Sequence, residues 1–239
     1  MKVEGRWDQC FAPRLYLAGS KTSITITQSS GFMSVEYMER VYNTYSRVYD
    51  LLFGKVFQSG RELAPELLEC APGMSILEVG VGTGLSFQYL PRTIDITAID
   101  LSQKMLDKAE ERARELGMKR LALQKMDATR LEFPDNSFDR VFAAYFISTV
   151  PEPVKVVNEM RRVCKPGGYI VFCNHWQSEH PVGAAIDKII SPLCYRIGFK
   201  TDLNLRKLMR ETGLEIESIE PVGLLGHWKA VRCINAKPA

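Results

Sequence analysis

Between residues 75 and 173 of the 239-residue chain, short apolar runs alternate with stretches whose apolar residues recur at helical spacing. Short apolar runs bounded by turn residues predict buried strands. The expected strands are 75–79, 95–100, 121–125, 138–147 and 169–173, and the expected helices between them are 84–90, 102–116 and 154–163. Strands that alternate with helices imply a parallel sheet with right-handed crossovers.

Two later apolar stretches, 214–219 and 228–234, follow a predicted helix at 204–212 and are separated by Gly223 and Gly226. A short connection between two strands favours an antiparallel pair, which we expect at one edge of the sheet. The predicted fold is therefore α/β, with a doubly wound, mostly parallel sheet of seven strands.

Two amphipathic stretches, 38–56 and 61–70, precede the first strand and predict helices. Residues 1–32 show only weak periodicity, so we expect a poorly ordered N-terminal extension, or a start placed too early, ahead of one domain at 33–239. A substrate-side insertion is expected at 181–202, above the carboxyl ends of the strands, where open α/β sheets bind ligands. Its apolar residues at helical spacing are Ile186, Ile189, Ile190, Leu193, Cys194 and Ile197.

Composition narrows the class of protein. The chain is 46% hydrophobic, enough for a sizeable core, and its net charge of +3, without a dense basic run, argues against nucleic acid as a partner. Six cysteines lie far apart without a C-x-x-C pair, which indicates reduced thiols in a cytosolic protein and no metal site. The longest apolar run, 141–147, is far shorter than the ~20 residues that span a bilayer, so membrane contact is expected to be peripheral.

The first predicted strand runs into a glycine loop, Gly80-x-Gly82-x-Gly84. A nicotinamide dinucleotide is one candidate ligand, but its fingerprint requires Gly or Ala at the sixth position, where this chain has Leu85. The spacing, with Glu78 ahead of it, instead resembles the S-adenosylmethionine loop of class I methyltransferases. Glycines allow close backbone approach to the methionine part, and N–H groups at the start of the following helix attract its carboxylate.

Acidic residues also stand at the ends of the next two predicted strands. Asp100 follows Gly80 by 20 residues and can accept hydrogen bonds from both ribose hydroxyls, while Asp127 and Ala128 can hold the adenine amino group. Glu78 supplies negative charge for the positively charged amino and sulfonium groups. The predicted cofactor-binding residues are Tyr49, Glu78, Gly80, Gly82, Gly84, Asp100, Leu101, Met105, Asp127 and Ala128.

From residue 33 to the C-terminus, successive segments resemble the motifs of class I methyltransferases. These segments are LEVGVGTG, ITAIDLSQKML, QKMDATRLEFPDNSFDRV and EMRRVCKPGGYIVF. The resemblance implies a Rossmann-like methyltransferase sheet, an N-terminal helical lid within residues 33–70, and S-adenosylmethionine as cofactor.

Within that family, three features resemble bacterial phospholipid N-methyltransferases, which methylate phosphatidylethanolamine toward phosphatidylcholine. They are VYDLLFGKVFQSGR, FISTVPEPVKVVNEMRRVCKPGG and the strand-end pair Asn174-His175. Quinone-ring C-methyltransferases share the early Tyr-Asp and the Pro-Gly-Gly turn, so a C- or O-methyltransferase acting on a quinone or another small aromatic acceptor stays as the alternative.

Methylation of an amine requires a nucleophilic nitrogen. An alkylamine is mostly protonated at neutral pH, so the site must accept a proton or disfavour the charged amine, and aromatic faces can stabilise the methylated ammonium. The candidate catalytic residues are Tyr49, Tyr145 and His175, and the candidate substrate-binding residues are Tyr45, Tyr145, His175 and Arg196. Core packing is the competing interpretation of the tyrosines, and an ordinary loop position that of His175.

A phospholipid acceptor requires contact with a membrane. The helix at 38–56 and the segment 186–199 both resemble interfacial helices, with basic residues that favour an anionic surface. We therefore expect a cytoplasmic protein associated peripherally with the inner face of the cell membrane. A non-catalytic S-adenosylmethionine-binding module and a nucleic-acid methyltransferase are weaker alternatives, because the three acidic residues are present and no Asn/Asp-Pro-Pro-aromatic loop occurs at 147–151.

Overall fold

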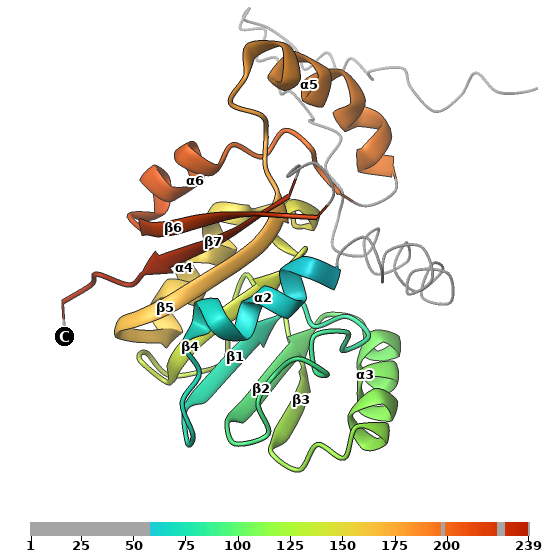
Figure 1. The fold of residues 1–239 in the computed structure, drawn as a ribbon, viewed down its shortest axis with the longest axis vertical. Helices are drawn as coiled ribbons and strands as arrows, with labels where there is room; N and C mark the ends of the chain where they lie inside the picture. The colour runs from blue at the N-terminus through green and yellow to red at the C-terminus, as the bar shows by residue number, and fades with distance from the viewer. Residues whose placement is uncertain (1–57, 197–198, 224–227, 239) are drawn as a thin grey trace, which may run out of the picture. The chain divides into compact units, whose positions relative to one another are not determined.

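A computed structural model describes residues 58–196, 199–223 and 228–238, which all belong to the second of two units, residues 33–239. These residues form an α/β fold around one seven-stranded sheet (Figure 1). The strands are β1 (Ser75–Val79), β2 (Asp95–Asp100), β3 (Leu121–Lys125), β4 (Phe138–Ala144), β5 (Cys164–His175), β6 (Glu215–Val222) and β7 (Trp228–Ile234).

The strand order is β3-β2-β1-β4-β5-β7-β6. The first five strands in this order are parallel, whereas β7 is antiparallel to both β5 and β6. This confirms the predicted doubly wound sheet with its antiparallel edge pair. Because β2 and β4 lie on opposite sides of β1, the strand order reverses at β1, and ligands of open α/β sheets bind at such a switch point.

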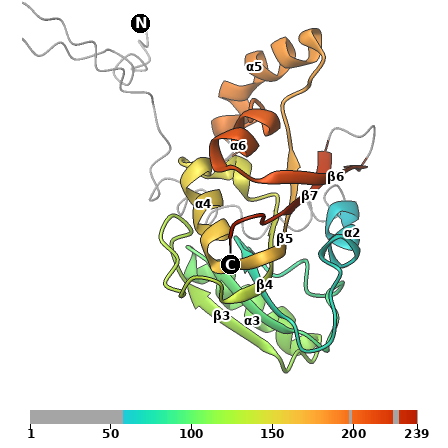
Figure 2. The ribbon, with the colours of Figure 1, turned by 90° about the vertical axis from the view of Figure 1, so that its left-hand side faces the viewer.

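Five α-helices of the described chain accompany the sheet (Figure 2). None of these described helices is long and apolar enough to cross a bilayer. Two clusters of buried apolar residues form the cores on its two faces. Helices α2 and α3 pack into one cluster with Ile76 and Phe142, and α4 and α6 pack into the other with Leu77 and Val141. Neighbouring strand residues point to opposite faces, which is why both faces are buried. The helices are α2 (Gln58–Leu68), α3 (Gln103–Glu115), α4 (Pro153–Val163), α5 (Pro181–Arg196) and α6 (Leu205–Thr212).

Side-chain caps fix where two predicted helices begin. The Ser102 hydroxyl accepts the Met105 N–H at 3.3 Å ahead of α3, and the Asn204 carbonyl oxygen accepts the Lys207 N–H at 2.9 Å ahead of α6. Such caps satisfy backbone donors that have no partner within the helix. Both helices start where the sequence pattern predicts.

The helix predicted at 84–90 was wrong. Residues after the glycine loop form successive turns, in which Phe87 N–H donates to Gly84 O at 3.1 Å and Tyr89 N–H donates to Ser86 O at 3.0 Å. Gly84 has a left-handed φ of 75°, with the Phe87 ring against it, so the backbone enters this segment in a conformation that α-helices do not use.

The fifth strand is also longer than predicted. The Pro-Gly-Gly turn, residues 166–168, is part of β5, because Gly167 N–H donates to Asn235 O and Asn235 N–H donates to Gly168 O, both at 2.9 Å. The Asn235 side chain adds a hydrogen bond from its amide nitrogen to Cys164 O at 2.8 Å. Contacts from the far end of the chain therefore hold this glycine-containing segment extended.

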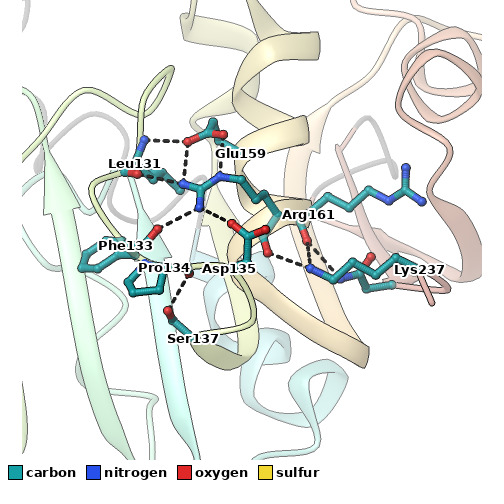
Figure 3. Close-up of polar contacts among 10 residues, drawn as sticks. Leu131, Phe133, Pro134, Asp135, Ser137, Glu159, Arg161 and Lys237 are labelled. Atoms are coloured by element: carbon teal, nitrogen blue, oxygen red, sulfur yellow. Dashed lines mark hydrogen bonds and ion pairs between the residues drawn. The ribbon is translucent and has the colours of Figure 1, made fainter. Parts of the chain in front are cut away.

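Arg162 on α4 fixes the loop that follows β3. Its guanidinium donates to the Glu159 and Asp135 carboxylates at 2.8 Å each and to the backbone oxygens of Leu131 and Phe133 at 2.8 Å each. Figure 3 shows Glu159, Asp135 and these backbone groups converging on one point. The loop they anchor begins beside Asp127, so the same contacts position one wall of the site.

The remaining predictions for the N-terminus are not addressed by this structure. The helix at 38–56, with Tyr45 and Tyr49, lies outside the described residues, as does the extension at 1–32. Of the predicted N-terminal helices, only the second is described, as α2, which runs a few residues earlier than expected.

Candidate active site

One cleft opens at the carboxyl ends of β1, β2 and β4 and joins most of the predicted cofactor residues. Its lining comes from the glycine loop, the start of α3, the loop after β3, and the segment that follows β4. The predicted residues that line it are Glu78, Gly80, Gly82, Asp100, Leu101, Met105, Asp127, Ala128 and Tyr145. Gly84 is not part of the lining and instead packs against Phe87.

The glycine loop is anchored to β2 and shaped by left-handed residues. Gly80 and Val81 donate their N–H groups to Ile99 O at 2.9 and 3.0 Å. Gly80 has φ +72°, and a Cβ there would lie 2.1 Å from the Phe146 ring, so no side chain fits. Gly82 has φ +56° and no atom within 4 Å of its Cβ position, which leaves open space on that side of the loop.

Asp100 is held by the loop it faces. Its Oδ2 accepts the Gly82 N–H and its Oδ1 accepts the Ser102 N–H, both at 2.9 Å. Burial raises the pKa of this carboxyl, and the N–H groups of Ser102, Gly82 and Leu101 counteract that shift. The two oxygens are therefore fixed in direction, and each has a lone pair left for a hydroxyl donor in the cleft.

Glu78 is 2% exposed at the base of the same cleft. The Ser86 hydroxyl lies 2.7 and 2.8 Å from its two oxygens. Burial raises the pKa of Glu78 to about 7, while the Ser86 hydrogen bond and the nearby Arg61 charge act to lower it. A cation in the cleft would favour the charged form of this carboxylate further.

Arg61 is a site residue that the sequence reasoning missed. It enters the cleft from α2, is only 7% exposed, and its guanidinium carbon lies 5.1 Å from the centre of the Tyr145 ring. Its charge acts on the buried Glu78. The only signal was its place at the end of VYDLLFGKVFQSGR, because burial of a charged helix residue depends on tertiary packing.

The loop after β3 forms the opposite wall. The Asp127 Oδ1 accepts the Thr129 N–H at 2.8 Å, which closes a local turn, and Ala128 is buried beside it. Asp127 itself is exposed, so its second oxygen faces solvent or ligand. Both residues line the cleft, and their role in holding an adenine ring stays a prediction.

Tyr145 follows β4 in a left-handed conformation, with φ 57°, which is uncommon for a residue with a side chain. Its N–H donates to Cys173 O, and its hydroxyl end lies against Gly60, where a Cβ would come within 2.3 Å of the oxygen. Tyr145 is therefore packed between α2 and the cleft, so the same residue belongs to the core and lines the cleft.

His175 does not line this cleft. It ends β5, with its ring edge-on to Trp228 at a centroid distance of 6.3 Å and its Nε2 3.9 Å from the Asp187 Oδ1 on α5. Arg196 is the last residue of α5, and only its backbone is described. The structure thus separates the predicted residues into a cleft group and a group at the junction of β5 with α5.

Comparison with known proteins agrees with this geometry. Residues 77–172 match the family described as a methyltransferase domain. A phosphatidylethanolamine N-methyltransferase from Cereibacter sphaeroides is 37% identical over 191 residues, which cover 80% of this chain and 93% of that protein. A demethylmenaquinone methyltransferase from Desulfitobacterium hafniense (strain Y51) is 31% identical over 163 residues, which cover 64% of each protein.

A solved structure of an S-adenosylmethionine-dependent methyltransferase from Aquifex aeolicus shows the same fold, with a TM-score of 0.61 and 21% identity. The match covers 82% of this chain and 97% of that one. The chain belongs to the class I S-adenosylmethionine-dependent methyltransferases.

This methyltransferase uses S-adenosylmethionine, which supplies a methyl group carried on a positively charged sulfur. The residues present fit that cofactor, because the cleft combines open space at Gly82 with the buried carboxylate of Glu78 and the half-buried carboxylate of Asp100. We propose that Asp100 binds the ribose hydroxyls, that Glu78 faces the methionine amino group, and that Asp127 and Ala128 hold the adenine.

Proposed function

We propose that this methyltransferase transfers methyl groups to the amine of phosphatidylethanolamine, and to its partly methylated intermediates, toward phosphatidylcholine. The observation that carries the proposal is the 37% identity to the Cereibacter sphaeroides enzyme, which extends over 93% of that protein. The demethylmenaquinone methyltransferase from Desulfitobacterium hafniense is matched over only 64% of its length. The longer and more similar match supports the phospholipid acceptor over the quinone.

Methylation of the headgroup amine requires residues that accept its proton and stabilise the methylated product. The headgroup ammonium must release a proton before its nitrogen can attack, because only the neutral amine has a lone pair. His175 does not line the cofactor cleft, so we propose that it accepts this proton through a bridging water and that Asp187, 3.9 Å from its Nε2, helps to stabilise the charged imidazole. The aromatic faces of Tyr145 and of the predicted site residues Tyr45 and Tyr49 are proposed to favour the methylated ammonium.

A phospholipid acceptor also determines the expected location of the enzyme in the cell. We propose that it is cytoplasmic and associates peripherally with the inner face of the cell membrane, where its substrate is located. Two basic residues of the insertion, Lys188 and Arg196, are proposed to favour anionic lipid. The third, Lys200, instead donates to the backbone oxygens of Val150 and Pro151.

Labelled methyl transfer tests the acceptor directly. The full chain is incubated with methyl-labelled S-adenosylmethionine and vesicles that contain phosphatidylethanolamine, and the lipids are separated into mono-, di- and trimethylated products. A parallel reaction offers a demethylated quinone in the same vesicles, because that is the alternative acceptor. Label in the quinone and none in phosphatidylethanolamine would replace the proposal with the alternative.

A matched pair of histidine variants tests the proposed base. His175→Asn is expected to lower the rate by about a hundredfold or more, with S-adenosylmethionine binding retained. His180→Asn, at an exposed position five residues further along, is the control and is expected to keep the wild-type rate. Equal rates for both variants would remove His175 from the mechanism and leave the acceptor assignment intact.

A further inference from the structure

Two of the described residues that line the cofactor cleft have aromatic rings, Tyr145 and Phe146. The Arg61 guanidinium lies over the Tyr145 ring, with its carbon 5.1 Å from the ring centre. In the part of the chain that the structure describes, no basic side chain stacks on the Phe146 ring. Phe146 therefore offers the cleft an aromatic ring that no described cation covers.

The Phe146 ring occupies the space that a side chain on the first loop glycine would need. A Cβ at Gly80 would overlap the ring, and Gly80 has a left-handed φ of 72°. Glycine at this position therefore allows the ring to stand directly beside the loop. Phe146 is only half-buried and lines the cleft, so protein atoms do not cover its ring completely.

The backbone around Phe146 is fixed on both sides. Tyr145, before it, has a left-handed φ of 57°, and its N–H donates to Cys173 O. After it, the Thr149 N–H and hydroxyl both donate to Phe146 O, at 2.8 and 2.7 Å. A left-handed residue with a side chain costs free energy, and such strain is concentrated at functional sites. These contacts determine where the Phe146 side chain leaves the backbone.

The order of groups along S-adenosylmethionine indicates which of them meets this ring. The sulfonium lies between the methionine amino group, proposed to face Glu78, and the ribose, proposed to bind Asp100. Gly80 follows Glu78 by two residues and donates its N–H to Ile99 O, immediately before Asp100. The sulfonium is therefore expected beside Gly80, where the Phe146 ring stands.

A sulfonium requires a partner of particular chemistry. It carries a positive charge but has no N–H or O–H group, so it cannot donate such a hydrogen bond to a carboxylate. The negative face of an aromatic ring attracts a cation within about 6 Å of the ring centre without a hydrogen bond. Because Glu78 and Asp100 are proposed to bind other groups of the cofactor, Phe146 is the described residue that suits the sulfonium.

We propose that the Phe146 ring binds the sulfonium of S-adenosylmethionine by cation–π attraction. When the acceptor attacks, its electron pair forms the new bond to the methyl carbon, and the electrons of the broken C–S bond remain on sulfur. Sulfur becomes a neutral thioether, so the attraction to the ring is lost. Phe146 thus favours the charged cofactor over S-adenosylhomocysteine, the product, and promotes their exchange. This holds for either proposed acceptor.

Fluorinated phenylalanine at position 146 tests the charge interaction with little change in shape. Fluorine withdraws electrons from the ring face, so one, two and three fluorines weaken a cation–π contact in steps. Calorimetry on the full chain without acceptor measures the affinities for S-adenosylmethionine and S-adenosylhomocysteine. The affinity for S-adenosylmethionine is expected to fall in steps, by about three- to thirtyfold in all, while that for S-adenosylhomocysteine stays constant.

Phe87 provides a matched control. Its ring packs against Gly84 of the same loop, but it is fully buried and does not line the cleft. The same fluorine series there is expected to leave the ratio of the two affinities unchanged. Phe146→Leu, which keeps an apolar side chain without a ring, is expected to lower that ratio as far as three fluorines do. Urea unfolding checks that each variant is folded, and if Phe146→Leu is not, the fluorine series decides.

Two results would overturn the proposal. An affinity for S-adenosylmethionine that does not change along the series at position 146 would show that the ring only fills the space beside Gly80. Equal losses of affinity for both ligands would show that Phe146 acts through the packing of the loop. If the loss is restricted to S-adenosylmethionine and no phosphatidylethanolamine is labelled by the wild type, the inference stands and the proposed acceptor fails.

Discussion

The Ser86 hydroxyl lies within hydrogen-bonding distance of both carboxylate oxygens of Glu78, at 2.7 and 2.8 Å, beneath the glycine loop. A hydroxyl has a single hydrogen to donate, so this contact compensates only part of the cost of burying the charge. The Arg61 charge supplies a second, smaller contribution. The pKa of Glu78 therefore stays at about 7.

The first prediction concerns stability and pH. Because burial raises the pKa of Glu78 from 4.5 to about 7, the folded protein binds more protons than the unfolded chain between these values. Stability contributed by this residue is therefore expected to fall as pH rises through that window, by roughly 3 kcal/mol at most. Urea unfolding across the window is expected to show this slope in the wild type but not in Glu78→Gln.

The control for this measurement is Glu66→Gln, at an exposed position on α2. It is expected to keep the wild-type slope. A Glu78→Gln protein with the same pH dependence as the wild type would mean that Glu78 is already charged throughout the window.

The second prediction concerns Arg61. Removal of its charge in Arg61→Ala is expected to raise the pKa of Glu78 further, because Arg61 lowers it in the wild type. A neutral Glu78 attracts the cationic cofactor less, so S-adenosylmethionine affinity is expected to fall by about tenfold, most strongly below neutral pH. Calorimetric titrations at several pH values check this. Arg92→Ala, at an exposed position outside the cleft, is the control and is expected to bind with wild-type affinity.

The third prediction compares the carboxylates at the two ends of β2. Asp100→Ala is expected to weaken S-adenosylmethionine binding by roughly tenfold to a hundredfold, the value of a charged hydrogen-bonding partner. Asp95→Ala removes a carboxylate from the other end of the same strand, where it pairs with Arg120 on the surface, and is expected to leave binding unchanged. Full affinity in Asp100→Ala would show that the ribose lies elsewhere.

Alanine at two loop glycines separates folding from binding. Gly80→Ala combines a left-handed φ with a clash against Phe146 and is expected to cost roughly 2–4 kcal/mol of stability. Gly82→Ala bears only the backbone strain, about 1–2 kcal/mol. Its methyl group would enter the open side of the loop, so it is expected to weaken cofactor binding about tenfold. Urea unfolding and cofactor titration of both variants check the contrast.

The local pattern of apolar residues was sufficient to predict most strands of the sheet. The strands 75–79, 95–100, 121–125 and 228–234 are found at the predicted residues, because each is a short apolar run bounded by turn residues. The segment 84–90 failed, because its helical spacing gave no hint that a left-handed Gly84 would receive the Phe87 ring. Conformation there is decided by one backbone angle and one aromatic contact.

The side of a helix that faces the core was harder to predict from the sequence. Helical spacing correctly predicts a helix in the insertion 181–202, but by itself it favours isoleucines that face the core. Asp187 and Ser191 face inward because their partners come from segments before and after the helix. The same limitation applies to Arg61, whose burial depends on Tyr145 more than eighty residues away.

The position of β7 has a consequence for how the polypeptide assembles. β6 precedes β7 along the chain, yet β6 borders only β7, and β7 fills the place beside β5. During synthesis, β6 therefore emerges without a neighbour to pair with, and the edge of β5 stays open until β7 arrives between them. Unpaired strand edges recruit other chains, so a ribosome that stalls before residue 228 would leave a nascent product prone to aggregation.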